Sequence, residues 1–582
     1  MTQYLLPQND GDLTRKTNLE AARAECQYRI VKPGVPLVDG VPSYDQTPLT
    51  YGIEALKSFF ARRSNLEAVK NKSGFLFDAG LPSLSTVDVV KLILSGNISS
   101  LTRYYAPDLG TISPSGRPKV PRDYDRLFIK DPLPDMAYVF ESDVHFANFF
   151  VAGPDPYMIE KVSAVPEKFP FTEKHVQSVP LLRRENLLEA LQQGRVFIVD
   201  YKNLSVLEPS HHPQQKRYVY APIAAFMVRP AEGSLIPFAI QLGQSPKDRT
   251  IYTPTDGWSW RIAKDMIKSS ACSHSAIVTH LTETHLLMEI FVCTTYRHLS
   301  TKHPLHALLK DHFTNTLRIN EGAFEALVGP GQFVDRIVGN SHASGLALAH
   351  RARMNYDFKK HYLPRLFRDR GTAPDGNLRD YAVRDDGLMI WEAMHQWISD
   401  YVAFYYPDDN AVKSDFELTA WAQEIASPDV GHIQNFGTVP GAFHTKSDLV
   451  DALTMILYIS GPGHAVVNFI QKSAMVYHPA APLAGFIPEI RGYGHTEKDW
   501  LNFLAPLDVA LVQETLFMLL GSVYFGQLGH YSSTFSDAPI AAALKRYQNR
   551  LTEIESLIHQ KNKTRIPYTH LLPSKIPQSI NI

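Results

Sequence analysis

Apolar positions follow two different spacings along the chain. Three runs rich in Val, Ile, Tyr and Phe, separated by turn residues, are typical of strands: Val196–Tyr201, Tyr218–Val228 and Leu235–Leu242. After Trp258 the apolar residues recur at helical spacing in long segments that continue nearly to the end of the chain. Two polar loops interrupt these segments, Asp369–Asn377 and Pro407–Asp415. The pattern predicts a mainly α fold with a minor antiparallel β-sheet.

The N-terminal part of the chain is less regular. One helix is predicted near Asn18–Tyr28, and the Pro-, Gly- and Asp-rich stretch Ala106–Pro134 predicts a long irregular loop. Between them, Tyr51–Ser64 carries apolar residues at helical spacing and basic residues on the other side. The apolar residues are Ile53, Leu56, Phe59 and Phe60, and the basic ones are Lys57, Arg62 and Arg63. This pattern fits a helix on a lipid surface, but a helix packed on the protein body is the favoured interpretation.

Composition narrows the class of protein. The 582 residues are 44% apolar and 20% charged, which is typical of a soluble globular chain with a large core. Lys plus Arg total 58 against 59 Asp plus Glu, so no overall field attracts nucleic acid. The N-terminus lacks the pattern of a standard signal peptide, and no uninterrupted apolar run reaches about 18 residues. We therefore expect a cytoplasmic protein that contacts a membrane at most from one side.

The cysteines agree with a reducing compartment. They are few and have no metal-type spacing: Cys26, Cys272 and Cys293. They are expected to be free thiols.

Two pairs of residues in the helical half have the spacing of metal ligands. His280 and His285 are five positions apart, which on a regular α-helix leaves them about 140° apart. They converge only if the helix is widened, so a π-type bulge is predicted at Thr282–Thr284. His464 and Asn468 are four positions apart and share a face, and Gly461-Pro462-Gly463 before them is expected to break or kink the helix.

These pairs lie in segments that resemble a known family. The segment Trp260–His312 contains Ala263-Lys264, Thr284-His285, Glu289, Arg297, Leu299, His303-Pro304 and Leu308-Leu309 around the first pair. The second pair lies in Gly463–Gln471, GHAVVNFIQ, and the chain ends in Ile576–Ile582, IPQSINI. In these three segments and their separations the chain resembles the lipoxygenases. The resemblance runs from about residue 46 to the end, which predicts an N-terminal extension over 1–45 and one catalytic domain over 46–582, without the N-terminal β-sandwich of plant and animal members.

The resemblance implies a metal centre. Carried over position by position, its ligands are His280, His285, His464, Asn468 and the α-carboxylate of Ile582, holding one non-haem iron. Such a mixed nitrogen and oxygen set suits a redox-active transition metal, and manganese fits the same ligands. The stretch His280–His285 is not the HExxH arrangement of a zinc peptidase. The other histidines of the region are assigned as hydrogen-bonded core residues: His298, His303, His306 and His312.

The resemblance also implies the reaction, which is insertion of O2 into a polyunsaturated fatty acid with a cis,cis-1,4-pentadiene to give a hydroperoxide. A hydroxide on the ion is expected to accept the proton, and no side chain is expected as acid or base. Ala323 matches a position that influences product chirality, Leu327 a leucine that holds the reactive carbon, and Gln471 an amide bonded to the Asn ligand. Core packing is the alternative for Ala323 and Leu327. A hydroperoxide isomerase and a non-catalytic lipid-binding protein remain alternative functions.

The chain departs from the family in one place near the centre. Where relatives have His followed by Glu or Gln, this chain has Ser275-Ala276, so the usual partner of Gln471 is missing. His274 is one position out of register and is not expected to substitute. No Arg that would meet a substrate carboxylate is identifiable, so the substrate orientation and the oligomeric state stay open.

Overall fold

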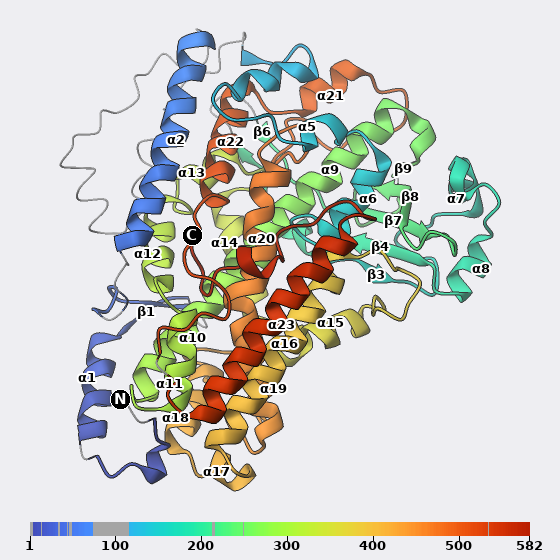
Figure 1. Ribbon diagram of the computed structural model, residues 1–582. Helices are drawn as coiled ribbons and strands as arrows, with labels where there is room; N and C mark the ends of the chain where they lie inside the picture. Colours follow the sequence, from blue (N-terminus) through green and yellow to red (C-terminus); the bar gives the residue numbers. More distant parts are fainter. Residues whose placement is uncertain are drawn as a thin grey trace.

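The structure, a computed structural model, describes residues 4–12, 14–32, 35–43, 45, 49–73, 116–211, 216–247, 249–533 and 535–582. Figure 1 shows a body of long helices with a small sheet at one side. The central helices are α9 (Trp258–His274), η8 (Ser275–Leu286), α10 (Leu287–His298), α16 (Ala382–Tyr405), α19 (Lys446–Tyr458), η11 (Ile459–Gly463), α20 (His464–Ile470), α22 (Leu507–Leu520) and α23 (Ala538–Lys561). The mainly α prediction is confirmed.

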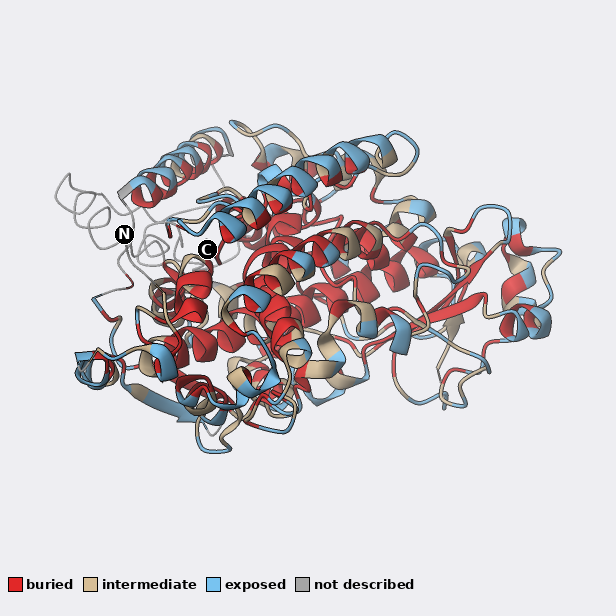
Figure 2. Cartoon of the chain, turned by 60° about the horizontal axis from the view of Figure 1, so that its bottom comes forward, coloured by how far each residue is buried: buried red, intermediate tan, exposed pale blue. Residues whose placement is uncertain are grey.

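The other helices surround this body. They are α1 (Thr14–Glu25), α2 (Leu49–Ser73), α5 (Met136–Val139), α6 (Asp143–Ala152), α7 (Glu173–Ser178), α8 (Leu187–Gln192), α11 (Pro304–Leu309), α12 (Thr316–Ala326), α13 (Phe333–Ile337), α14 (His342–Met354), α15 (Leu363–Asp369), α17 (Asp409–Lys413), α18 (Phe416–Ala426) and α21 (Glu497–Phe503). Figure 2 shows buried residues throughout the centre, with exposed positions on the outer faces of the surrounding helices. The apolar periodicity of the sequence therefore corresponds to one large core.

The sheet is antiparallel, with strand order β3-β4-β7-β8-β9. Its three longest strands are β4 (Val196–Asp200), β7 (Ile223–Val228) and β8 (Leu235–Gln241), and the two short edges are β3 (Glu160–Lys161) and β9 (Ile251–Tyr252). These are the three predicted runs, although β7 begins at Ile223 and not at Tyr218. Every residue of β4, β7 and β8 is buried, because helices cover both faces of the sheet. This explains why the runs are continuously apolar and do not alternate.

The N-terminal elements differ in their bounds from the prediction. The helix predicted at Asn18–Tyr28 is α1, which ends at Glu25, and Tyr28 starts the hairpin strand β1 (Tyr28–Lys32), paired with β2 (Val35–Val38). Arg15 of α1 is buried and pairs with Glu417 of α18 at 2.6 Å. The extension therefore packs on the helical body, while the domain boundary at residue 45 stays a prediction.

Two predicted loops contain short helices. The part of Ala106–Pro134 from residue 116 onward includes the 3-10 helix η4 (Pro121–Leu127), and residues 106–115 lie outside the described residues. The loop Pro407–Asp415 contains α17. The helix predicted at Tyr51–Ser64 is the longer α2, with Tyr51, Leu56 and Phe59 buried against the body, as the packed interpretation requires.

Two helical stretches in the described part of the chain are long and apolar enough to cross a membrane by length and composition alone. They are Trp258–His298 and Lys446–Met475, and a bent pair, Glu497–Phe503 with Leu507–Leu520, makes a third if it is counted as one span. The most apolar windows of the first two are 78% and 94% buried inside the protein. The sequence rule required an uninterrupted apolar run and missed these stretches, which polar residues interrupt.

Candidate metal centre

The helix that carries His280 and His285 is widened, as their spacing predicts. The π-helix η8 spans twelve residues, Ser275–Leu286, and is therefore longer than the predicted bulge at Thr282–Thr284. Two threonine hydroxyls bond to its carbonyl groups: Thr282 Oγ1 donates to Ile277 O at 2.7 Å, and Thr284 Oγ1 donates to His280 O. These bonds compensate for the altered backbone hydrogen bonding of the wide turn.

The segment before His464 is widened rather than broken. Pro462 lies inside η11, a five-residue π-turn that joins α19 directly to α20. Of the predicted break or kink, the break does not occur, because the wider turn accommodates the proline and lets the helix continue. The kink stays a prediction. His464 and Asn468 follow on α20, where both are buried.

The three histidines converge through their Nε2 atoms. Nε2 of His280 lies 3.2 Å from Nε2 of His285 and 3.3 Å from Nε2 of His464. Three nitrogen ligands about 2.1 Å from one ion lie about 3.0 to 3.4 Å apart, depending on the angle between them. The ligand atoms of the three histidines all lie within 4.8 Å of one another. The residues therefore fit a transition-metal ion.

The surroundings keep these imidazoles neutral, as metal ligands must be. Burial lowers the pKa of His280 and His464 well below the ordinary value, and the neighbouring histidines lower it further. Burial also lowers the pKa of His285 to about 4, against the effect of its hydrogen bond with Asn320. Desolvation is the largest influence on the pKa of all three, and a hydrogen bond with the backbone of Ile582 partly offsets it at His464.

The outer ring nitrogens have different partners. Nδ1 of His285 lies 2.8 Å from Oδ1 of Asn320, and Nδ2 of Asn320 donates to the buried Glu289 at 2.6 Å. Nδ1 of His280 lies 3.2 Å from the Gln471 amide, whereas Nδ1 of His464 has no partner among the described residues. Asn320 was missed in the sequence. Its position three residues before Ala323, nearly one helical turn away, was the available signal.

Asn468 lies one helical turn after His464 on α20, and Ile582 lies beside His280 and His285. Asn468 Nδ2 donates to Leu520 O at 2.9 Å, and its Oδ1 lies 3.4 Å from Gln471 Nε2. Ile582 is 8% exposed and lines the same cavity as His280. The residue before it is anchored as well, because Tyr51 donates to Asn581 O at 2.6 Å. Figure 1 shows the C-terminus returning to the middle of the helical body.

The remaining histidines of the region lie elsewhere in the core. His303 bonds to Asp415 at 2.9 Å, His312 to Gln578 at 3.0 Å, and His298 to Glu424. These three are hydrogen-bonded as predicted. His306 differs, because it is buried with both ring nitrogens unpartnered among the described residues and packs on the ring of Tyr296.

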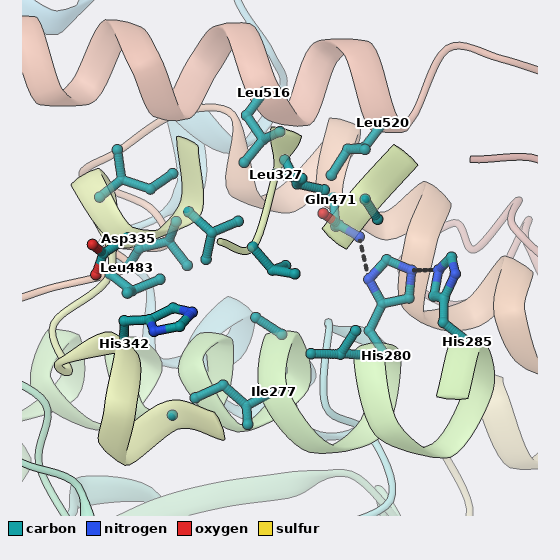
Figure 3. Close-up of a pocket in the computed structure, with 18 of the residues that line it drawn as sticks. Ile277, His280, His285, Leu327, Asp335, His342, Gln471, Leu483, Leu516 and Leu520 are labelled. Carbon is teal, nitrogen blue, oxygen red and sulfur yellow. Dashed lines mark hydrogen bonds between the residues drawn. The ribbon is translucent and has the colours of Figure 1, made fainter. Parts of the chain in front are cut away.

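An apolar cavity of about 130 Å³ leads to this centre. Ala323 and Leu327 line it together with His280 and His285, so both predicted residues lie beside the centre. Figure 3 shows leucines along its wall and the polar residues Asp335 and His342 at the end opposite His280 and His285. The space suits a long apolar ligand.

The departure at Ser275-Ala276 changes the local contacts. Ser275 Oγ donates to Pro154 O at 2.7 Å, and Ala276 lines the apolar cavity. His274 points into a second cavity on the other side of η8, where it pairs with Asp155 at 2.9 Å. His274 therefore does not replace the missing partner, and the Gln471 amide reaches His280 instead.

Comparisons with known proteins agree with this geometry. A family model described as Lipoxygenase matches residues 128–577. A linoleate 9/13-lipoxygenase of Pseudomonas aeruginosa is 38% identical over 473 residues, which cover 77% of this chain and 68% of that protein. The hydroperoxide isomerase ALOXE3 of Homo sapiens is 32% identical over 447 residues, covering 75% of this chain and 62% of that protein.

A solved structure matches the whole chain. It is that of a calcium-dependent 11R-lipoxygenase, with a TM-score of 0.84 and 27% identity over 100% of this chain and 83% of that one. The family model covers well over half of the sequence, and the fold agrees over its full length. The chain is thus a member of the lipoxygenase family, whose enzymes are fatty-acid dioxygenases.

Proposed function

We propose that this protein is a non-haem iron lipoxygenase that inserts O2 into free or esterified polyunsaturated acyl chains. The observation that carries the proposal is the convergence of three neutral imidazoles at the inner end of an apolar cavity, with Nε2 of His280 3.2 Å from that of His285 and 3.3 Å from that of His464. When bound there, an iron ion supplies the one-electron redox change that hydrogen abstraction from a bis-allylic carbon requires.

The proposed ligands are His280, His285 and His464, completed by Asn468 and the terminal carboxylate of Ile582. The side-chain amide of Asn468 is held by two contacts, because Nδ2 donates to Leu520 O at 2.9 Å and Oδ1 accepts from Gln471 Nε2 at 3.4 Å. The amide oxygen of Asn320 lies 2.8 Å from Nδ1 of His285 and can accept from the protonated Nδ1 of that ring. Outer contacts of this kind orient metal-binding imidazoles and raise their basicity.

The cavity wall holds the substrate and excludes water. Leu327 is half-buried beside the histidines, and we assign it to contact with the reacting part of the acyl chain. Ala323, one turn earlier on α12, is assigned to the side from which O2 approaches. An apolar wall that excludes water also protects a carbon radical from side reactions with water and dissolved solutes.

Oxygen consumption by the untagged protein with linoleate tests this function. Steady uptake of about one O2 per linoleate, by protein containing iron, is the expected result. Manganese in place of iron would change the metal assignment, since both accept this ligand set. Consumption of an added hydroperoxide without O2 uptake would replace the proposal with hydroperoxide isomerase.

We also propose a cytoplasmic location with peripheral membrane contact through α2. Ile53 and Phe60 of α2 are 41% and 48% exposed, and Lys57 lies on the same helix. Apolar side chains flanked by lysine bind weakly to an anionic lipid surface. Cosedimentation with anionic vesicles should fall for Ile53→Ser/Phe60→Ser, and equal binding of this variant and the wild type would remove the helix from the contact.

A further inference from the structure

The end of the apolar cavity away from the metal-centre histidines contains an unpaired buried acceptor. Asn340 lines the cavity, is 3% exposed and lies two residues before His342, which Figure 3 places at this end. Its Nδ2 donates to Ser341 O at 3.0 Å, which fixes the amide so that Oδ1 is the free atom. Oδ1 is buried and has no partner among the described residues. Because a buried acceptor without a donor is unfavourable, this oxygen points to a ligand that donates a hydrogen bond.

The backbone around this acceptor is held by a buried arginine. Arg217 is 2% exposed, and its guanidinium donates to Asp335 O at 2.7 Å and to Arg336 O. It also donates to Ser210 Oγ at 2.7 Å. Arg217 therefore holds the backbone of α13 in place, and it does not itself line the cavity.

The other side of the acceptor is fixed as well. Ser341 N donates to Glu208 O at 2.8 Å, so the chain on both sides of Asn340 is tied to neighbouring segments. Gly345 of α14 leaves the space that the Asn340 amide occupies, because a Cβ at this position would lie 2.6 Å from Nδ2. A polar atom held in this way is preorganised for binding, and little order has to be gained when a ligand arrives.

The charges at this end disfavour a free carboxylate. Among the described residues that line the cavity there is no Lys or Arg, and the acidic side chain Asp335 lies at the polar end. A carboxylate offers only acceptors, whereas Asn340 Oδ1 requires a donor, and Asp335, whose Oδ2 accepts from Gly331 N at 2.8 Å, offers no donor. A hydroxyl can donate to one of these oxygens and accept from His342, which lies beside Asp335 in Figure 3.

We propose that this end of the cavity binds a neutral, hydroxyl-bearing head group, as in the glycerol ester of a fatty acid, with Asn340 Oδ1 as its acceptor. The proposal rests on the proposed function, because the acyl chain then lies along the apolar wall toward His280. It names the substrate class of the same site as acylglycerol in preference to free acid. A neutral head group needs no basic side chain, which agrees with the lack of Lys and Arg among the described residues that line the cavity.

The proposal can be tested by binding alone with two saturated ligands, an ester and a free acid. Neither contains a pentadiene, so neither can be oxygenated during the measurement. Calorimetry of the metal-loaded protein with monodecanoylglycerol and with decanoate, both below their critical micelle concentrations, gives the ratio of the two affinities. We expect the ester to bind at least about tenfold more tightly. Asn340→Val should reduce this ratio about three- to tenfold, the effect of losing one hydrogen bond.

Two further variants make the result specific. Ser341→Ala removes the cap that Ser341 Oγ provides for Ser344 N but leaves Asn340 Oδ1, so the ratio should stay unchanged. Asp335→Asn should improve decanoate binding by removing a repulsive charge, and it carries the test if Asn340→Val does not fold.

Equal affinities for the two ligands, or a ratio that Asn340→Val and Asp335→Asn both leave unchanged, would overturn the head-group proposal. This failure is distinguishable from failure of the proposed function. A protein that prefers the ester but consumes no O2 with linoleate or with its glycerol ester would retain the head-group site and lose the lipoxygenase activity. A protein that consumes O2 but shows no preference would do the reverse.

Discussion

The π-helix η8 separates two cavities whose buried histidines have opposite electrostatic environments. On one side, His280 and His285 face an apolar cavity, and burial lowers their pKa, that of His285 to about 4. On the other side, His274 is buried as well, but the charge and the hydrogen bond of Asp155, at 2.9 Å, together outweigh desolvation and raise its pKa. Burial alone therefore does not decide the protonation of a histidine, and the presence of a carboxylate does.

This difference corresponds to two tasks. A neutral imidazole has a lone pair for a metal ion, whereas a protonated imidazole paired with a carboxylate is a structural ion pair. Thr279 connects the two sides, because it precedes His280 in the chain and donates to Asp155 Oδ1 at 2.9 Å. The charged side thus fixes the helix whose other side presents the two proposed ligands, His280 and His285.

The largest effect is expected from removing a nitrogen on the neutral side. His285→Ala should lower the metal content to background and abolish O2 uptake, because the two remaining imidazoles cannot hold the ion alone. Metal analysis measures the loss of metal, and circular dichroism shows whether the variant is folded. His559→Ala, at an exposed histidine of α23, is the control and should change neither. Full metal content in His285→Ala would remove this residue from the ligand set.

A single glycine added after Ile582 should be nearly as severe. Ile582 is buried at the centre, and Asn581 before it is anchored by Tyr51, so an added residue must displace the carboxylate. The expected result is loss of O2 uptake and of most of the metal. The same glycine placed at the N-terminus serves as the control. An active, metal-loaded extended protein would show that the carboxylate is not a ligand.

Asn320 offers a smaller change on the same side. Asn320→Leu removes the partner of His285 Nδ1, and loss of such outer contacts typically weakens metal binding about 10- to 100-fold. Competition with a chelator measures this affinity. Asn355→Leu, at the exposed end of α14, should leave it unaltered. Unchanged affinity in Asn320→Leu would mean that packing alone orients the His285 ring.

The sequence predicted features that depend on near neighbours. The three strands, the long helices and the convergence of His280 and His285 follow from periodicity or from a spacing of a few residues. The contacts on the charged side do not, because Thr279 and Asp155 are 124 positions apart, and Asn320 is 35 positions from His285. The full length of η8 was missed for the same reason, since Ser275, where it begins, bonds to the distant Pro154.

The charged side can be broken separately. Asp155→Asn should lower the free energy of unfolding by about 3 kcal/mol at pH 6, because it leaves a buried charge without its partner. The pKa of His274 is raised in the folded protein, so this stabilisation is complete below about pH 6.5 and is lost as the pH rises through the higher folded pKa. The effect of the substitution should therefore diminish at high pH.

Urea unfolding at a series of pH values measures this dependence. Asp451→Asn is the matched control, because the His395–Asp451 pair has the same 2.9 Å separation but both side chains are substantially exposed, 41% and 38%. It should cost less than about 1 kcal/mol. Equal losses for the two variants would show that the pair behind η8 is not stabilised by its burial.

Ala323→Gly on the neutral side is expected to change the rate of O2 uptake least of all these variants. It should instead change the product. Ala323 is half-buried at the cavity wall. A fully buried methyl group contributes about 0.8 kcal/mol, and about 1.4 kcal/mol changes a ratio tenfold, so the ratio of S to R hydroperoxide should change at most several-fold. Chiral chromatography of the linoleate products measures this ratio. Ala347→Gly, at an exposed position of α14, introduces the same backbone freedom without opening the cavity and should leave the ratio unchanged. If Ala323→Gly also leaves it unchanged, Ala323 is a packing residue, and the side of O2 attack is set elsewhere along the apolar wall.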